Sequence, residues 1–112
     1  MTSEDEPFRI QADFCKAMAH PVRLRIIDLL KRRPSTVTEI VRAIRVSQAN
    51  ASQHLAVLRA RGVVRAERRG NGVVYSLADR RVISALDLLR TVMTDNLLQK
   101  TALVDLLMHA QS

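Results

Sequence analysis

The spacing of apolar residues along the chain predicts five helices. The predicted helices cover residues 8–18, Pro21 to near Pro34, Thr36 to about Ile44, Ser47 to Gly62, and Asp79 to about Met108. Residues 1–7 are polar and acidic and are predicted to form a flexible tail. Asp95-Asn96 interrupts the apolar pattern of the last helical region. The pattern therefore leaves open whether that region is continuous, kinked or broken.

Residues at the predicted helix ends are of types that start or stop helices. Pro21 suits the first position of a helix, where its missing N–H has no helical partner to lose. Thr36 followed by Glu39 has the capping-box pattern, in which each side chain satisfies a backbone N–H of the other residue. Ser47 is predicted to cap the next helix, and Gly62 to end it. The third and fourth helices are then separated by a very short turn.

Two β-prone runs, 63–69 and 73–77, flank Gly70-Asn71-Gly72, which is a strong signal for a hairpin turn. Two helices joined by a short turn and followed by a basic hairpin make a winged helix-turn-helix, whose second helix enters the major groove of DNA. The predicted fold class is therefore mainly α with a small two-stranded β-wing, in the order α-α-α-α-β-β-α.

The positive charge of the chain is concentrated in its middle segment. The formal net charge is +7 over 112 residues. Residues 20–81 hold fourteen basic and four acidic side chains, a net charge of +10, whereas residues 1–19 and 82–112 carry −2 and −1. This distribution favours a protein that binds a polyanion through its middle and assembles through its ends. Aromatic residues make up only 3%, which argues against stacking on single-stranded nucleic acid.

The sequence shows no pattern of an enzyme, a membrane protein or a disulfide-stabilised protein. No nucleophile–base pair, phosphate-binding loop or metal cluster is visible, so neither catalysis nor a cofactor is predicted. The single cysteine excludes an internal disulfide. No signal sequence opens the chain and no apolar run approaches 18 residues. We therefore expect a cytoplasmic protein with no membrane partner.

The fourth predicted helix carries polar side chains that are poor core residues but are suited to hydrogen bonds with DNA. They are Ser47, Gln48, Asn50, Ser52, Gln53 and His54. Ser47 is predicted to cap the helix and to contact a phosphate in addition. The next residues are predicted to contact bases or phosphates, and the alternative is an ordinary solvated helix face. His54 either contacts DNA or supports a residue that does.

Basic side chains at the end of this helix and on the hairpin are candidates for contacts to the DNA backbone. Arg59 and Arg61 lie late in the helix, where phosphate contact and simple solvation are both open. Arg65, Arg68 and Arg69 on the hairpin are predicted to reach the adjacent groove or the backbone.

The chain resembles the ArsR/SmtB (arsenic-repressor-type) winged-helix transcriptional regulators. The segments that carry the resemblance are residues 16–30, 39–44, Ser47-Gln48, 52–59, 62–64 and 72–77, in this order and spacing. The resemblance covers roughly residues 12–90.

The resemblance implies a repressor that binds an imperfect palindrome in double-stranded DNA as a homodimer. It implies that residues 8–112 form one winged-helix domain, with 8–19 and 79–108 as the dimerisation helices. It also implies release from DNA by a small signal, often a metal ion. The sequence does not identify that signal.

The residues that hold metals in this family are replaced here. Thr36 and Thr38 occupy the positions of its cysteine cluster, and neither is a thiolate ligand. Asp79 and Asp95 match the carboxylates of its other site, but Arg81 and Val92 stand at the two histidine positions. We therefore predict that both metal sites are absent and that Asp79 is a helix cap.

Cys15 has two possible roles. A lone cysteine on an apolar helix face is most often a buried small hydrophobic residue. The alternative is a redox or reactive-sulfur sensor that switches the repressor through Cys15.

Overall fold

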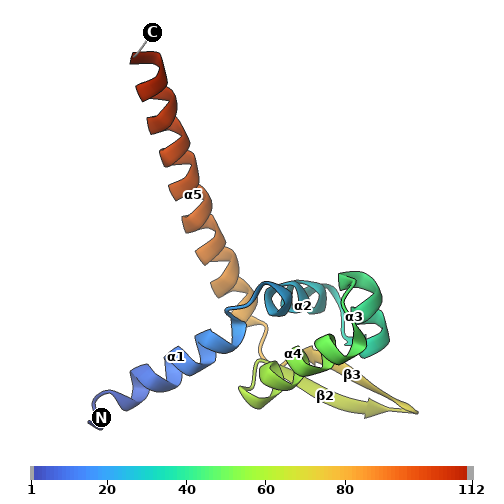
Figure 1. The fold of residues 1–112 in the computed structure, drawn as a ribbon. Helices are drawn as coiled ribbons and strands as arrows, with labels where there is room; N and C mark the ends of the chain where they lie inside the picture. Colours follow the sequence, from blue (N-terminus) through green and yellow to red (C-terminus); the bar gives the residue numbers. More distant parts are fainter. Residues whose placement is uncertain (1, 111–112) are drawn as a thin grey trace. The chain divides into compact units, whose positions relative to one another are not determined.

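The computed structural model describes residues 2–110, which form two compact units divided after Arg80. The elements of the first unit are α1 (Glu6–Met18), α2 (Pro21–Arg32), β1 (Ser35–Thr36), α3 (Val37–Ile44), α4 (Gln48–Ala60), β2 (Val64–Arg69) and β3 (Gly72–Leu77) (Figure 1). The second unit is the helix α5 (Arg81–Ala110). The predicted class, mainly α with a small β-wing, is confirmed.

One helix begins earlier than the sequence predicts, and one alternative that the sequence left open is resolved. Helix α1 begins at Glu6, so Glu6 and Pro7 belong to the helix and not to the predicted flexible tail. A proline at the start of a helix loses no hydrogen bond, and a carboxylate in the first turn is favoured by the helix dipole. Helix α5 is a single helix that passes through Asp95-Asn96 without a break.

The core lies where α2, α3 and α4 meet the base of the hairpin. Its fully buried large side chains are Ile26, Ile27, Leu30, Ile40, Leu55, Leu58 and Val63. Each of the three helices places one apolar side inward at the three- and four-residue spacing that one face of a helix requires. In α4 the buried residues are Ala51, Leu55 and Leu58, which fixes the side of α4 that remains outside.

The sheet has three strands in the order β1-β3-β2, all antiparallel. Strand β1 was not predicted, because two residues are too short to show an alternating pattern. It pairs Ser35 with Tyr75 and Thr36 with Val74, which lie far away in the sequence. The side chain of Ser35 is buried, and its hydroxyl donates a hydrogen bond to the carbonyl of Arg33 at 3.2 Å.

Local contacts confirm the predicted ends of α3 and α4. Thr36 and Glu39 form the capping box at the start of α3. At the end of α4, Gly62 has a φ of 77°, and its N–H donates to the carbonyl of Arg59. The N–H of Val63 donates to the carbonyl of Leu58, which completes a Schellman motif. The chain therefore leaves α4 directly into β2.

The turn between α3 and α4 is held by one residue of unusual backbone and one long-range hydrogen bond. Arg45 has a φ of 64°, which lies in the left-handed region. Arg25 of α2 donates from Nη2 to the carbonyl of Ile44 at 2.9 Å. This bond satisfies a carbonyl at the end of α3 that has no partner within the helix. The angle at which α4 leaves the turn thus depends on a side chain of α2.

We expect Leu55→Ala to lower the free energy of unfolding by about 2–5 kcal/mol, because it leaves a cavity between α4 and the core. Leu55 is 0% exposed, whereas Val57 on the same helix is 38% exposed. Val57→Ala is the matched control, for which a much smaller loss is expected. Urea unfolding of both variants measures the difference, and equal losses would contradict the assigned inner side of α4.

Candidate nucleic-acid interface

The outer side of α4 presents a row of polar side chains that have no partner within residues 2–110. Gln48, Asn50, Ser52, Gln53 and Arg59 are all exposed. Within the described residues their side chains make no hydrogen bond or ion pair. Ser47 is the predicted cap, since its Oγ accepts a hydrogen bond from the N–H of Asn50 at 3.1 Å. The sequence therefore places these groups where a large ligand can reach them.

This arrangement suits the edges of base pairs. The side chains of Gln48, Asn50 and Gln53 each carry a hydrogen-bond donor and an acceptor. The edge of an adenine also has one donor and one acceptor, so such a side chain can pair with it through two hydrogen bonds. An α-helix fits the width of the major groove of B-form DNA. The small residues Ala49 and Ala56 lie exposed on the same outer side, so no bulky group blocks close approach of this surface to a base edge.

His54 lies differently from the other predicted residues of α4. It is half-buried, and its ring contacts the ring of His20 with 4.3 Å between the centroids. His20 caps α2, and its Nδ1 accepts a hydrogen bond from the N–H of Val22 at 3.1 Å. This contact packs His54 of α4 against the start of α2, and its contact with DNA stays a prediction. The contact could not be predicted from residue spacing, because its two residues lie 34 positions apart in the sequence.

The surroundings of His54 disfavour its protonated form. Burial is the main cause that lowers the pKa of His54, and the nearby His20 and Arg23 add to the effect. Arg23 has its Nε buried with no hydrogen-bond partner in the described part of the chain. A proton on His54 would therefore add positive charge near the guanidinium of Arg23, whose Nε is buried.

The three arginines of the hairpin divide into two kinds. Alternation along β2 puts Arg65 and Arg69 on one face of the hairpin and Arg68 on the other. Arg65 donates from Nη2 to the carbonyl of Ala78 at 2.6 Å, and Arg69 lies 3.6 Å from the carboxylate of Glu67. Arg68 is exposed and has no ion pair or side-chain hydrogen bond among residues 2–110. Arg68 is thus the hairpin arginine most available to a phosphate.

Two further exposed arginines precede α4 closely in the sequence and were not predicted to contact DNA. Arg42 near the end of α3 and Arg45 in the turn before α4 are exposed. Within the described residues neither side chain has a hydrogen bond or an ion pair. Their only signal in the sequence was their place in the positively charged middle segment.

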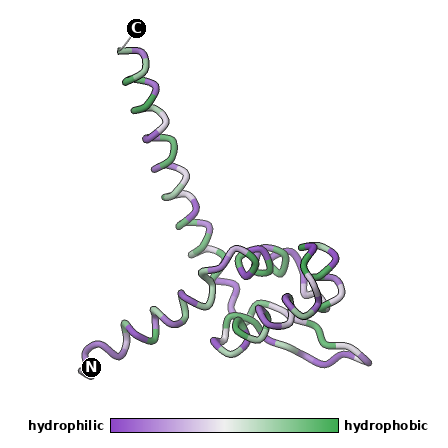
Figure 2. Tube along the Cα trace, in the orientation of Figure 1, coloured by the Kyte–Doolittle hydropathy of each residue, from purple (hydrophilic) through white to green (hydrophobic). Residues whose placement is uncertain are grey.

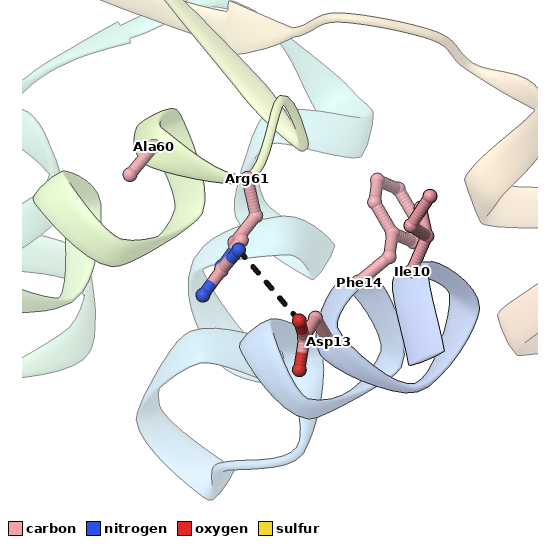
Figure 3. Close-up of a pocket in the computed structure, with 5 residues that line it drawn as sticks. All are labelled: Ile10, Asp13, Phe14, Ala60 and Arg61. Atoms are coloured by element: carbon pink, nitrogen blue, oxygen red, sulfur yellow. Dashed lines mark ion pairs between the residues drawn. The ribbon is translucent and has the colours of Figure 1, made fainter. Parts of the chain in front are cut away.

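An open hollow of about 230 Å³ separates α1 from the end of α4 (Figure 3). Its walls are Ile10, Asp13 and Phe14 of α1 together with Ala60 and Arg61. Figure 3 shows Asp13 and Arg61 facing one another, and their charged atoms lie 4.0 Å apart. Both side chains are about half exposed, so this ion pair adds little stability.

Cys15 is exposed on α1, which corrects the expectation of a buried hydrophobic residue. The neighbours Ala17 and Met18 are the residues of α1 that are buried instead. Ala17, two positions after Cys15, faces the opposite side of the helix, and the loose apolar pattern of α1 did not reveal which side is inside.

Among residues 2–110 there is no group of three or more His, Cys, Asp or Glu side chains placed to hold a metal ion. Thr36 corresponds to a position of the cysteine cluster in the family that the sequence resembles. In this structure Thr36 forms the capping box of α3. No helix in the same part of the chain is long and apolar enough to cross a membrane.

Comparison with known proteins gives consistent similarities. Residues 20–66 match the model of the bacterial regulatory protein arsR family. The chain is 38% identical over 104 residues, 91% of either chain, to Rv0081 of Mycobacterium tuberculosis, an uncharacterised HTH-type transcriptional regulator. The crystal structure of Rv0081 superposes with a TM-score of 0.78 over 84% of this chain and 95% of that one, at 37% identity.

Of two other similar proteins, one is a transcriptional repressor and the other is a homodimer. The transcriptional repressor PagR of Bacillus anthracis is 33% identical over 93 residues, which cover 82% of this chain and 88% of PagR. The solution structure of a homodimeric winged helix-turn-helix DNA-binding domain from Mycobacterium bovis, a possible ArsR-family transcriptional regulator, superposes with a TM-score of 0.77 at 28% identity. The superposition covers 87% of this chain and 91% of that domain.

We expect the free energy of unfolding to fall as the pH is lowered from about 7.5 to about 5.5. The pKa of His54 is lowered in the folded chain, and the unfolded chain keeps the ordinary value of 6.5. The unfolded state therefore binds more protons in this range, and stability present above pH 6.5 is lost as the pH falls through the pKa of the folded state.

His54→Gln should make this pH dependence shallower. Ala56→Gln, which places the same side chain at an exposed position of α4, is the control and should keep the original slope. Urea unfolding at several pH values measures both, and an unchanged slope in His54→Gln would contradict the environment assigned to His54.

Proposed function

The chain belongs to the ArsR family of bacterial regulatory proteins, and from this premise we propose that it represses transcription by binding a palindromic operator as a homodimer. A winged helix-turn-helix of this family is a DNA-binding transcriptional regulator. The dimer would occupy an operator that overlaps a promoter and exclude the polymerase sterically. The family model, the repressor PagR and the homodimeric relative support this proposal.

The observation that carries the proposal is the outer side of α4. Its polar side chains are exposed and unpaired within the described residues, while its inner side is fixed by Leu55 and Leu58 in the core. A surface with unsatisfied donors and acceptors on a rigid helix can discriminate between base pairs, because each wrong base leaves some of those groups unpaired. Gln48, Asn50, Ser52 and Gln53 are assigned to base edges.

The positive charge supplies affinity that does not depend on sequence. Arginines and lysines that neutralise phosphates release counterions, which makes binding strong and dependent on salt. Arg68 on the hairpin, Arg59 late in α4 and Arg45 in the preceding turn are exposed and have no side-chain partner in the described part of the chain. We assign these three to the DNA backbone, with the hairpin as the wing.

We assign dimerisation to α1 and α5, and DNA recognition to α4. Phe8 and Ile10 of α1 are 72% and 60% exposed, and α5 has no buried residue. Exposed apolar surface of this extent is typical of protein–protein interfaces. Two copies related by a two-fold axis would present two copies of α4 to DNA, which matches the symmetry of a palindrome.

We expect Gln53→Ala to lower discrimination between operator and random DNA by about 1–3 kcal/mol, because a side chain that pairs with a base edge is lost. Arg68→Ala should instead weaken binding to all sequences and reduce the slope of log K against log salt by about 1. Fluorescence anisotropy with the duplex upstream of the protein's own gene and with scrambled DNA measures both quantities.

Each variant is the control of the other in this experiment. A Gln53→Ala protein whose ratio of operator to random affinity is unchanged would show that Gln53 does not read a base. An Arg68→Ala protein that loses discrimination but keeps its salt dependence would remove the hairpin from the phosphate contacts.

A second candidate is a repressor that responds to oxidants or reactive sulfur through Cys15, and the exposure of its thiol favours this candidate. Treatment with peroxide or a persulfide should then lower operator affinity at least tenfold, and Cys15→Ser should abolish that loss. Equal affinity of the treated and reduced proteins would remove Cys15 as the switch and leave the repressor proposal intact.

A further inference from the structure

A second open hollow, of about 190 Å³, lies between α1, α2 and α4. It shares Asp13 and Arg61 with the hollow of Figure 3. All of its walls belong to the first compact unit. Its other lining residues are Lys16 and Ala17 of α1, Arg23 of α2 and Val57 of α4.

Positive charge predominates in this hollow. Lys16, Arg23 and Arg61 are cationic and Asp13 is the one carboxylate among the lining residues, so three positive groups and one negative group give a formal net charge of +2. A dianion matches this charge. A phosphate monoester carries a charge of about −1.5 to −2 at pH 7.

Two of the three cations have no partner within residues 2–110. The side chains of Lys16 and Arg23 make no hydrogen bond or ion pair there. The Nε of Arg23 is buried without an acceptor. A buried donor that lacks an acceptor costs free energy, and the cost is larger for a charged group. The guanidinium of Arg23 therefore keeps its capacity to donate hydrogen bonds to a ligand.

The third cation is held only weakly. The Nη1 atom of Arg61 lies 4.0 Å from Oδ2 of Asp13, and the two side chains are 55% and 45% exposed. An ion pair of this length and exposure contributes little free energy. Arg61 can therefore turn from Asp13 to an anion in the hollow at a small cost.

The chemistry of the walls suits an oxyanion that carries an apolar group. A guanidinium donates two parallel hydrogen bonds to phosphate oxygens, and a lysine ammonium adds a compact charge. Hydrophilic and hydrophobic residues both recur along α1 (Figure 2), and this helix supplies Lys16 and Ala17 to the same hollow. Ala17 and Val57 form the apolar part of the wall, against which the organic part of an ester can pack.

We propose that this hollow binds the phosphate group of a small ester through Lys16, Arg23 and Arg61, with Ala17 and Val57 against the organic part. The inference goes beyond the proposed function, which leaves the signal of the repressor unidentified. A ligand in the hollow would touch α1, assigned to dimerisation, and α4, assigned to DNA recognition. Only this regulatory consequence rests on the proposed function, because the site itself needs no DNA.

Calorimetric titration of the full-length protein with phenyl phosphate, at constant ionic strength and without DNA, tests the site. Lys16→Gln should weaken binding by about tenfold, because a charge-assisted hydrogen bond is lost. Asp13→Asn should strengthen binding by about threefold, because the repulsion between its carboxylate and the phosphate is removed. Both side chains are at least partly exposed, so both variants are expected to fold.

Arg32→Gln is the matched control, since it removes a positive charge from an exposed position at the end of α2 that does not line the hollow. Its affinity for phenyl phosphate should equal that of the unchanged protein. No binding by the unchanged protein, or equal losses in Lys16→Gln and Arg32→Gln, would overturn the proposal.

His54 reports on Arg23 without replacement of the arginine. After burial and His20, the charge of Arg23 is the third cause that lowers the pKa of His54. A phosphate bound to Arg23 offsets this charge, so saturating phenyl phosphate should raise the pKa of His54. The NMR shifts of the imidazole as a function of pH measure this value. An unchanged pKa at saturation would overturn the assignment of Arg23 to the site.

Operator binding separates a small phosphate ester from the phosphates of the DNA backbone. Lys16→Gln should leave the slope of log K against log salt for the operator unchanged. A slope reduced by about 1, in a protein that does not bind phenyl phosphate, would assign the hollow to DNA and overturn the small ligand.

The two measurements also separate this inference from the proposed function. A protein that binds phenyl phosphate with the expected effects of Lys16→Gln and Asp13→Asn, but binds no operator, would overturn the proposed function alone. A protein that binds its operator specifically but does not bind phenyl phosphate would overturn the phosphate site alone.

Discussion

The packing of α4 onto α2 and α3 is the constraint on which the rest of the structure depends. Leu55 and Leu58 are fully buried, together with Ile26, Leu30 and Ile40. Because a helix has one inner side at this spacing, burying these leucines forces the polar residues of α4 outward. The exposed polar side of α4 is therefore a consequence of the core. The Schellman motif after Leu58 then sends the chain into the hairpin, so the wing is positioned by the same packing.

The arginines of the middle segment differ in whether they already have a hydrogen-bond partner within the fold. The middle segment is strongly positive, but a charge that already has a partner contributes less to a ligand than a free one. Arg65 is held by a backbone carbonyl and Arg25 by the carbonyl of Ile44, so both stabilise the fold. Arg68 has no such partner in the described residues. Composition alone gives every arginine the same weight, and the fold separates those that hold the structure from those that remain available.

The two units of the chain differ in where their apolar residues lie. The first unit buries its apolar residues internally, whereas α5 leaves its apolar residues outside. Because α5 is one continuous helix, all of these exposed apolar residues belong to a single element. A break at Asp95-Asn96 would have divided this apolar surface between two helices.

Local chemistry was determined by the sequence itself: the capping box of Thr36 and Glu39, the cap at Ser47, the turn at Gly62 and the polar side of α4. These features depend on residues within one or two turns of each other, so spacing and side-chain type suffice to predict them. Only the tertiary structure decided the pairing of β1 with β3, the contact of His20 with His54, the exposure of Cys15 and the partners of the hairpin arginines. Each of these features depends on residues that folding brings together, or on which side of a helix faces the core. The spacing of apolar and polar residues along the chain does not predict such contacts.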